Sequence, residues 1–273
     1  MRATPVLAVA IAALLSVGAL AAPGPRIAIL IDDLGNDLAA GERALALPKA
    51  VGVAVLPQTP HARALALRAA AEGRDLLLHL PLESLDAEPL GPGGIEAGAT
   101  AAQVRAALVE GLGSVPAAVG VNNHMGSLLT QAPESMRVLL GALRERGLYF
   151  VDSYTTERSV ALRVAQELGV PATRRDVFLD PAPTESASPE AVIAEQWQRL
   201  LGLARARGVA LAIGHPNPVT LGWLERELPR SQEQGVALIP VGEVVRSETA
   251  GGNPWHASSS RSPTAARSSK PSP

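Results

Sequence analysis

The amino-acid sequence predicts an α/β fold, a barrel of seven or eight parallel strands alternating with helices. Short runs rich in Val, Ile and Leu alternate with longer segments of helical period, which is typical of parallel β/α units. The runs are continuously apolar, as expected for strands buried on both faces. Eight parallel strands are enough to close a barrel, and the predicted strands span residues 27–31, 51–56, 76–80, 118–121, 148–151, 177–179, 209–213 and 236–239.

Helix start signals support this division of the chain. Thr100 and Gln103 have the spacing of a capping box before a predicted helix over 104–112. Ser188, followed by a proline, is an N-cap signal before a predicted helix over 191–207. We therefore expect each of these helices to connect two parallel strands.

The first 22 residues have the features of a signal peptide. Arg2 provides the positive charge, residues 6–20 form an apolar run, and Ala19-Leu20-Ala21 is a small-residue cleavage site. An uncleaved membrane anchor is the alternative, but the run is short for a span of about 20 residues. We predict a periplasmic or otherwise extracytoplasmic protein with no stable membrane span after cleavage.

The other end of the chain has a different composition. Residues 248–273 are rich in Ser, Pro, Gly, Arg and Ala and have no apolar period, which predicts a disordered tail. Residues 23–247 remain as one barrel domain. We expect no second domain and no internal repeat.

Composition limits the possible functions. A length of 273 residues with 47% hydrophobic residues fits one domain with one substantial core. The formal net charge of −2 provides no basic field for phosphate backbones, so nucleic acid is not an expected partner. The sequence has no cysteine, which excludes disulfides and leaves His, Asp and Glu as ligands for any metal.

Polar residues follow most of the predicted strands at their carboxyl ends. One such residue is commonly a helix cap or a buried histidine. Several together indicate a site, because parallel topology brings the carboxyl ends of the strands to one face of a barrel. The loop over 83–98 also leaves the third strand on that face. The residues are Asp32, Asp33, His79, Asn122, Asn123, His124, Asp152, Asp180 and His215.

Four short strings give the sequence a resemblance to a known family. The chain resembles the divergent polysaccharide deacetylases, which are distantly related to the NodB-type deacetylases, over roughly residues 26–245. The resemblance implies a distorted β/α barrel with a divalent metal at its carboxyl face. The strings are Ile31-Asp32-Asp33-Leu34-Gly35, His79-Leu80-Pro81-Leu82-Glu83, Asn122-Asn123-His124-Met125-Gly126-Ser127 and Gly214-His215-Pro216.

Metal chemistry gives these residues distinct roles. A catalytic zinc takes about three protein ligands and leaves a position for water. We predict Asp33, His79 and His124 as the ligands and zinc as the ion. The resemblance to the NodB-type pattern implies that Asp32 is the general base. His215 is predicted to be the general acid that protonates the leaving amine.

The sequence departs from the NodB-type pattern at one position. That pattern has a second histidine four residues after the first, where this chain has Glu83. Glu83 is expected to orient His79, with direct ligation or a substrate contact as alternatives. Asp152 and Asp180 are expected to orient site residues, with Arg174 or Arg175 as their partners.

Two hypotheses follow for function. The first is an amidohydrolase that deacetylates a small or oligomeric N-acetylated saccharide. The second is a noncatalytic binding or scaffold protein of the envelope that retains the metal site. The Asp32–Asp33 pair with His215 favours the first, whereas Glu83 in place of the second histidine and the small number of aromatic residues favour the second. An aromatic content of 3% argues against a long sugar polymer, and the aromatic residues expected near the site are Tyr149, Phe150 and Tyr154.

Overall fold

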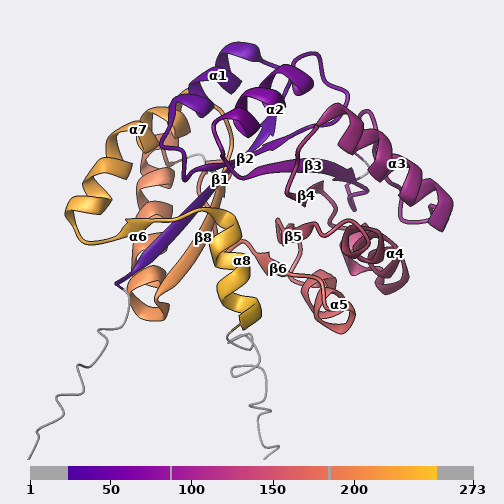
Figure 1. The fold of residues 1–273 in the computed structure, drawn as a ribbon. Coiled ribbons are helices and arrows are strands. Elements are labelled where there is room, and N and C mark those ends of the chain that lie inside the picture. The colour runs from indigo at the N-terminus through magenta and orange to yellow at the C-terminus, as the bar shows by residue number, and fades with distance from the viewer. Residues whose placement is uncertain (1–23, 87, 184–185, 251–273) are drawn as a thin grey trace, which may run out of the picture.

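A computed structural model describes residues 24–86, 88–183 and 186–250 and shows one curled parallel sheet with helices outside it (Figure 1). The strands lie in the order β6-β5-β4-β3-β2-β1-β8-β7, and β9 pairs with the amino end of β1. The strands are β1 Arg26–Leu34, β2 Gly52–Val55, β3 Leu76–Leu82, β4 Gly120–Met125, β5 Tyr149–Asp152, β6 Ala172–Arg174, β7 Val177–Phe178, β8 Val209–Gly214 and β9 Ala237–Leu238.

Each of the eight α-helices in the described ranges follows a strand along the chain. The expected starts of two are present: Thr100 forms a capping box with Gln103, and the Ser188 side chain accepts from Ala191 N. The helices are α1 Leu38–Ala46, α2 Ala62–Ala71, α3 Ala101–Ser114, α4 Pro133–Arg144, α5 Ala161–Leu168, α6 Pro189–Arg207, α7 Pro218–Glu233 and α8 Val241–Ala250, with a 3₁₀ turn η1 at Leu129–Gln131.

The predicted α/β fold is confirmed, with one difference in how the sheet closes. In the described parts of the chain no strand pairing joins β6 to β7, so the curled sheet stays open at that edge. Only Arg175 and Asp176 separate the two strands, and no helix lies between them. The sequence did not predict β6, because three residues are too short to show a strand pattern.

Alternate residues of the strands face two separate cores. Ile27, Ile29 and Ile31 of β1 pack in the large cluster between sheet and outer helices. Ala28 and Leu30 face inward and pack in a smaller cluster with residues of α8. Both faces of the strand are therefore buried, as the continuous apolar runs predicted.

Helix α8 lies at the amino ends of the strands. Val241, Val244 and Val245 are almost completely buried in the inner cluster. Asp75, just before β3, accepts a hydrogen bond from Gly242 N at 2.7 Å. The helix therefore covers the end of the sheet opposite the carboxyl ends.

The predicted terminal segments meet the described structure at one point. Helix α8 continues through residues 248–250, which the sequence had assigned to the tail. In its last turn the Thr249 hydroxyl donates to Val245 O at 2.8 Å. The predicted signal peptide and the rest of the predicted tail lie outside the described residues. Among the helices described, none combines the length and apolar character that crossing a membrane requires.

Candidate metal centre

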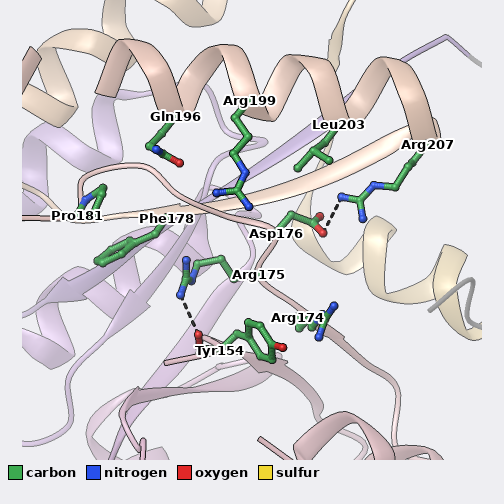
Figure 2. A pocket seen from close by; sticks show the side chains of 10 residues that line it. All are labelled: Tyr154, Arg174, Arg175, Asp176, Phe178, Pro181, Gln196, Arg199, Leu203 and Arg207. Atoms are coloured by element: carbon green, nitrogen blue, oxygen red, sulfur yellow. Dashed lines mark hydrogen bonds and ion pairs between the residues drawn. The ribbon is translucent and has the colours of Figure 1, made fainter. Parts of the chain in front are cut away.

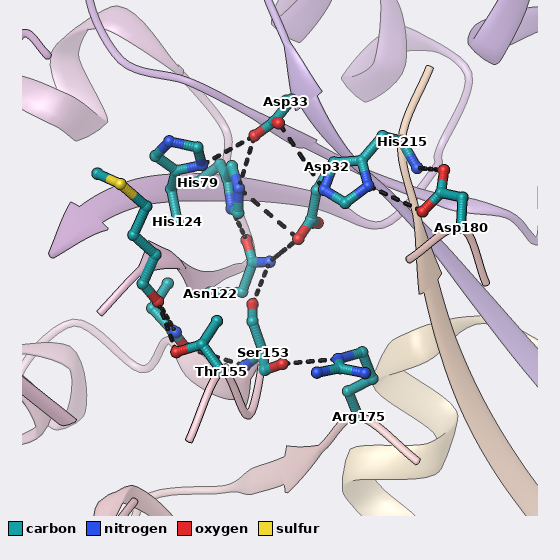
Figure 3. A network of polar contacts seen from close by, with 12 residues as sticks. Asp32, Asp33, His79, Asn122, His124, Ser153, Thr155, Arg175, Asp180 and His215 are labelled. Atoms are coloured by element: carbon teal, nitrogen blue, oxygen red, sulfur yellow. Dashed lines mark hydrogen bonds and ion pairs between the residues drawn. The ribbon is translucent and has the colours of Figure 1, made fainter. Parts of the chain in front are cut away.

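Three ligand-type side chains from β1, β3 and β4 converge at the carboxyl ends of the curled sheet, in which β2 lies between β1 and β3 (Figure 3). His79 Nε2 and His124 Nδ1 both lie 3.0 Å from Asp33 Oδ1. The ligand atoms of these three residues all lie within 4.8 Å of one another. Parallel pairing sets this geometry, because His79 pairs with Asn122 and Pro81 with His124 across β3 and β4.

Strand β1 is irregular where it enters the site. The pairing of β1 with β2 shifts register between Ile31 and Leu34. Asp33 has φ 60°, in the left-handed region that non-glycine residues seldom adopt. In a regular strand neighbouring side chains point to opposite faces. This bulge therefore lets Asp32 and Asp33 reach the same site.

Asn122 connects His79 to Asp32 in the buried part of the site. Its amide nitrogen lies 2.9 Å from both oxygens of Asp32 and 3.1 Å from Ser153 Oγ. Its amide oxygen lies 2.9 Å from His79 Nδ1. That contact leaves His79 Nε2 facing Asp33, which is the orientation a ligand needs.

The two aspartates have opposite electrostatic environments. Burial raises the pKa of Asp32, although His79 and His215 act against that shift. Burial also opposes ionisation of Asp33, but the imidazoles of His124 and His79 outweigh it and hold the pKa of Asp33 far below its ordinary value. The pKa of His79 is raised because Asp32 and Asp33 outweigh its burial. Of the two carboxyls, Asp33 is therefore the one that loses its proton at the lower pH.

His215 is held by Asp180, which follows β7, the strand paired with β8. Its Nδ1 lies 2.9 Å from Asp180 Oδ1, and its backbone N–H donates to Asp180 Oδ2 at 2.8 Å. Burial alone would lower the pKa of His215, but Asp180 outweighs it and raises the pKa to about 9. The other ring nitrogen, Nε2, lies 3.7 Å from Asp33 Oδ2.

Asp33, His79 and His124 are arranged as ligands of a divalent ion rather than as hydrogen-bond partners of one another. Asp33 Oδ1 is a buried atom that makes no hydrogen bond of acceptable geometry, although two imidazole nitrogens lie 3.0 Å away. The nitrogens therefore approach this oxygen without directing an N–H bond at it. Two imidazoles and one carboxylate are a donor set that zinc accepts at catalytic sites.

A small cavity opens over these groups. Its volume is about 70 Å³, and its walls include Asp32, His79, His124 and His215. Ser153, Thr155 and Phe178 also line it, although the sequence did not single them out. Ser153 directly follows Asp152 at the end of β5, and this position is the feature by which the sequence could have indicated it as a site residue. Phe178 meets the His215 ring edge-on at 5.3 Å between centroids.

Glu83 differs from the expectation. The structure shows Asn122 beside His79 Nδ1, whereas the Glu83 carboxylate accepts a hydrogen bond from Ala97 N at 2.6 Å. Glu83 is also absent from the group of residues whose ligand atoms converge. It fixes the loop between β3 and α3, because its backbone N–H also donates to Ile95 O of that loop at 3.0 Å.

Asp152, Asp180 and Asn123 are placed by local contacts. Asp152 accepts from Tyr154 N at 2.8 Å and Ser159 Oγ at 2.6 Å, and the positive charges of Arg174 and Arg175 act to lower its pKa against the effect of burial. Asp180 likewise binds His215, Asn217 and Thr220. Asn123 Oδ1 accepts from Ser153 N at 2.9 Å and so joins β4 to the end of β5.

The aromatic residues expected near the site lie in three different places. Phe150 is completely buried in the large core cluster. Tyr149 packs against Gly120 at the start of β4, so its ring is remote from the carboxyl ends. Tyr154 lines a separate cavity beside β6. None of the three lines the cavity over the metal ligands.

Comparison with known proteins places this geometry in a family. The sequence profile of the divergent polysaccharide deacetylases matches residues 29–245. The chain belongs to this family. The three candidate ligands Asp33, His79 and His124, together with Asp32 and His215, all lie within the matched residues.

Individual relatives agree with this assignment. An uncharacterized protein of Haemophilus influenzae is 37% identical over 223 residues, which cover 82% of this chain and 78% of that protein. The uncharacterized protein YibQ of Escherichia coli is 39% identical, over 80% of this chain and 66% of its own length. The crystal structure of an uncharacterized protein from Agrobacterium tumefaciens C58 has the same fold, with a TM-score of 0.76 at 23% identity, covering 82% of this chain and 90% of that one.

Proposed function

We propose that this divergent polysaccharide deacetylase is an exported, metal-dependent enzyme that removes the acetyl group from an N-acetylated saccharide. One observation carries the proposal. Two titratable groups flank the ligand triad: Asp32 lies 3.6 Å from His79 Nε2, and His215 lies 3.7 Å from Asp33. An acid and a base on either side of an ion site are what amide hydrolysis needs.

Asp32 is suited to accept a proton. It lines the cavity, and burial raises its pKa, which makes its carboxylate a stronger base than an exposed one. Asn122 donates to both oxygens and fixes the carboxylate plane. As the water oxygen attacks the acetamide carbonyl carbon, Asp32 accepts the proton that the water loses.

His215 is suited to donate a proton. With a pKa of about 9 it is protonated at neutral pH, and Asp180 occupies its Nδ1, so Nε2 faces the cavity. As the carbon–nitrogen bond breaks, His215 gives the Nε2 proton to the leaving nitrogen. The products are acetate and a saccharide with a free amine.

The ion would be held by Asp33, His79 and His124. When bound, it supplies Lewis-acid polarisation of the acetamide carbonyl and lowers the pKa of the attacking water. We propose zinc because imidazole and carboxylate donors suit it. We also propose action in the periplasm or another extracytoplasmic compartment, since the signal-peptide features of residues 1–22 support export.

A noncatalytic envelope protein that retains the ion site is the second candidate. It is favoured by the cavity volume of about 70 Å³, because pockets for small molecules commonly enclose about 300–1,000 Å³. An enzyme with this site would bind only the acetamido group inside the cavity and the sugar ring outside it.

Acetate release separates the two candidates. The zinc-loaded parent, Asp32→Asn and Asp86→Asn would be incubated with a panel of N-acetylated mono- and oligosaccharides. Asp86 is exposed on the loop after β3 and serves as a matched control. We expect release by the parent and Asp86→Asn and none by Asp32→Asn. A parent that retains its ion and releases no acetate from any substrate would favour the binding protein.

A further inference from the structure

The open edge of the sheet contains a second, larger cavity. It has a volume of about 520 Å³ and lies between the chain that crosses from β6 to β7 and helix α6 (Figure 2). We call it the arginine pocket after four of its lining residues, Arg174, Arg175, Arg199 and Arg207. It exists because no strand pairing closes the sheet between β6 and β7 in the described residues.

The lining of the arginine pocket is strongly basic, although the whole chain has a formal net charge of −2. Asp176 is the one acidic residue among the described residues that line it. Its carboxylate already accepts from Arg207 Nη2 at 2.8 Å and from Leu211 N at 2.8 Å. Asp176 is therefore engaged by these two partners, and its ion pair in the pocket is with Arg207 rather than with Arg175 or Arg199.

Arg175 and Arg199 lie at the centre of this charge. Arg175 donates through Nε to Ser153 O at 2.6 Å and through Nη2 to Tyr154 O at 2.9 Å, and it stacks over Phe178 at 4.8 Å. Those contacts fix its guanidinium in one orientation. Arg199 extends from α6 toward it in Figure 2. Across the ranges that the structure describes, no carboxylate lies within ion-pair distance of either guanidinium.

Arg175 and Arg199 are close enough for their charges to interact. Burial lowers the pKa of Arg175, the carboxylates of Asp32 and Asp152 act against that shift, and the like charge of Arg199 acts with it. Two guanidiniums brought together at a partly buried position repel each other. An oxyanion between them would reverse that repulsion, and guanidinium groups bind carboxylate and phosphate through paired N–H donors.

The arginine pocket adjoins the candidate metal centre. Arg175 and Phe178 line both cavities, and Phe178 also contacts the His215 ring. A ligand group in the arginine pocket would thus lie directly behind one wall of the metal-side cavity. The metal-side cavity accommodates little more than an acetamido group, so the rest of a substrate must bind elsewhere.

We propose that the arginine pocket binds an oxyanion, a carboxylate or phosphate carried by the saccharide substrate. This inference rests on the proposed function, because it assigns the anionic group to the molecule that is deacetylated. Arg175 and Arg199 provide the charge-assisted hydrogen bonds. The aromatic faces of Tyr154 and Phe178, over which Arg174 and Arg175 stack, hold two of the guanidiniums in place.

Calorimetry with three matched sugars tests the proposal. N-acetylglucosamine is neutral, N-acetylmuramic acid adds a carboxylate, and N-acetylglucosamine 6-phosphate adds a phosphate. For the zinc-loaded parent we expect at least one anionic sugar to bind about tenfold more tightly than the neutral one, as charged hydrogen bonds do. The preferred sugar identifies the oxyanion. Equal affinity for all three would overturn the proposal.

Two variants of α6 provide the residue-level test. Arg199→Gln removes one charge from the arginine pocket, whereas Arg205→Gln removes one from an exposed position of the same helix. We expect Arg199→Gln to abolish the preference for the anionic sugar and Arg205→Gln to retain it. Equal effects of the two variants would overturn the proposal, since they would reflect net charge alone.

The readout is independent of turnover. A parent that prefers the anionic sugar but deacetylates none would retain the arginine pocket and contradict the proposed function. A parent that releases acetate but shows no preference would retain the proposed function and contradict the arginine pocket.

Discussion

Asp32 and Asp33 are neighbours in the sequence, yet their environments differ in solvent access and in partners. Asp32 is buried and accepts from an amide, whereas the Asp33 side chain is 32% exposed and faces two imidazoles. The left-handed φ of Asp33 creates this difference by turning its carboxylate out of the strand pattern. Metal binding and base catalysis are therefore assigned to separate carboxylates.

Substitution by asparagine separates these two roles. Asp33→Asn replaces a charged ligand by a neutral one, so zinc affinity should fall by more than the roughly 10–100-fold that losing a ligand's partner costs. Asp32→Asn should keep the ion and abolish hydrolysis, because an amide cannot accept the proton. Metal content and acetate release of both variants measure this. Loss of the ion in Asp32→Asn with retention in Asp33→Asn would exchange the roles.

His215 should titrate according to its contact with Asp180. In the metal-free protein we expect a pKa of about 9 for His215. Asp180→Asn removes the charge that raises it and should move the titration toward 6.5, the ordinary value of histidine. NMR titration of the imidazole measures both. An unchanged titration in Asp180→Asn would show that other charges hold the proton.

The same contact has a defined effect on stability. Because folding raises the pKa of His215, its stabilisation is complete below about pH 6.5 and is lost as the pH rises through about 9. His215→Gln should remove this part of the pH dependence from urea unfolding of the metal-free protein.

In the zinc-loaded protein, His215→Ala should spare the ion and reduce turnover by about 10²–10⁴-fold.

At the scale of elements, the positions of most strands along the chain were predicted well and their carboxyl ends less well. The sequence located the site by placing polar residues after apolar runs, and the structure brings Asp33, His79 and His124 together. It stopped the strands too early, since β3 and β4 continue through the ligands to Leu82 and Met125. Polar residues can remain in a strand here because they bind one another across the pairing.

Two features of the site could not be predicted from the sequence. The partner of His79 is Asn122, whereas spacing along the chain suggested Glu83. Contacts across neighbouring strands depend on register, which a single sequence does not reveal. The arginine pocket was also not predicted, because it depends on β6 and β7 remaining unpaired.

Helix α8 is the last element of the described residues. The sequence predicts a domain that ends at residue 247, whereas the helix continues to Ala250. We expect truncation after Ala250 to leave the free energy of unfolding unchanged. Truncation after Pro240 removes Val241, Val244 and Val245 and uncovers the inner cluster that they pack against, which should cost several kcal/mol, at about 1.5–3 kcal/mol for each buried valine.

Urea unfolding of the two truncated chains and the parent measures this difference. The longer truncation product is the matched control, because it lacks the tail and retains α8. A clear loss of stability after truncation at Ala250 would mean that the remaining residues contact the domain. No loss after truncation at Pro240 would contradict the packing of α8 against the inner cluster.

At the scale of the whole molecule, the curled sheet brings distant parts of the sequence to one face. Asp32 and His215 are separated by most of the folded chain, yet β1 pairs directly with β8. The incomplete closure between β6 and β7 places a basic cavity beside the acidic and imidazole groups. Unlike charges are thus concentrated at neighbouring sites although the chain is nearly neutral.

Ion binding should therefore stabilise the whole fold, since the ligands come from three different strands, β1, β3 and β4. Zinc at about 100 times its dissociation constant contributes about 2.7 kcal/mol, which corresponds to a rise of roughly 5–10 °C in the melting temperature at this size. Magnesium should give a smaller rise because it prefers oxygen ligands. Thermal melting of the metal-free protein with each ion, together with elemental analysis to test for one ion per chain, measures this.

The variant Asp33→Asn should lose the stabilisation by zinc, and the control Asp86→Asn should retain it. Equal stabilisation of the parent and Asp33→Asn by zinc would locate the ion elsewhere.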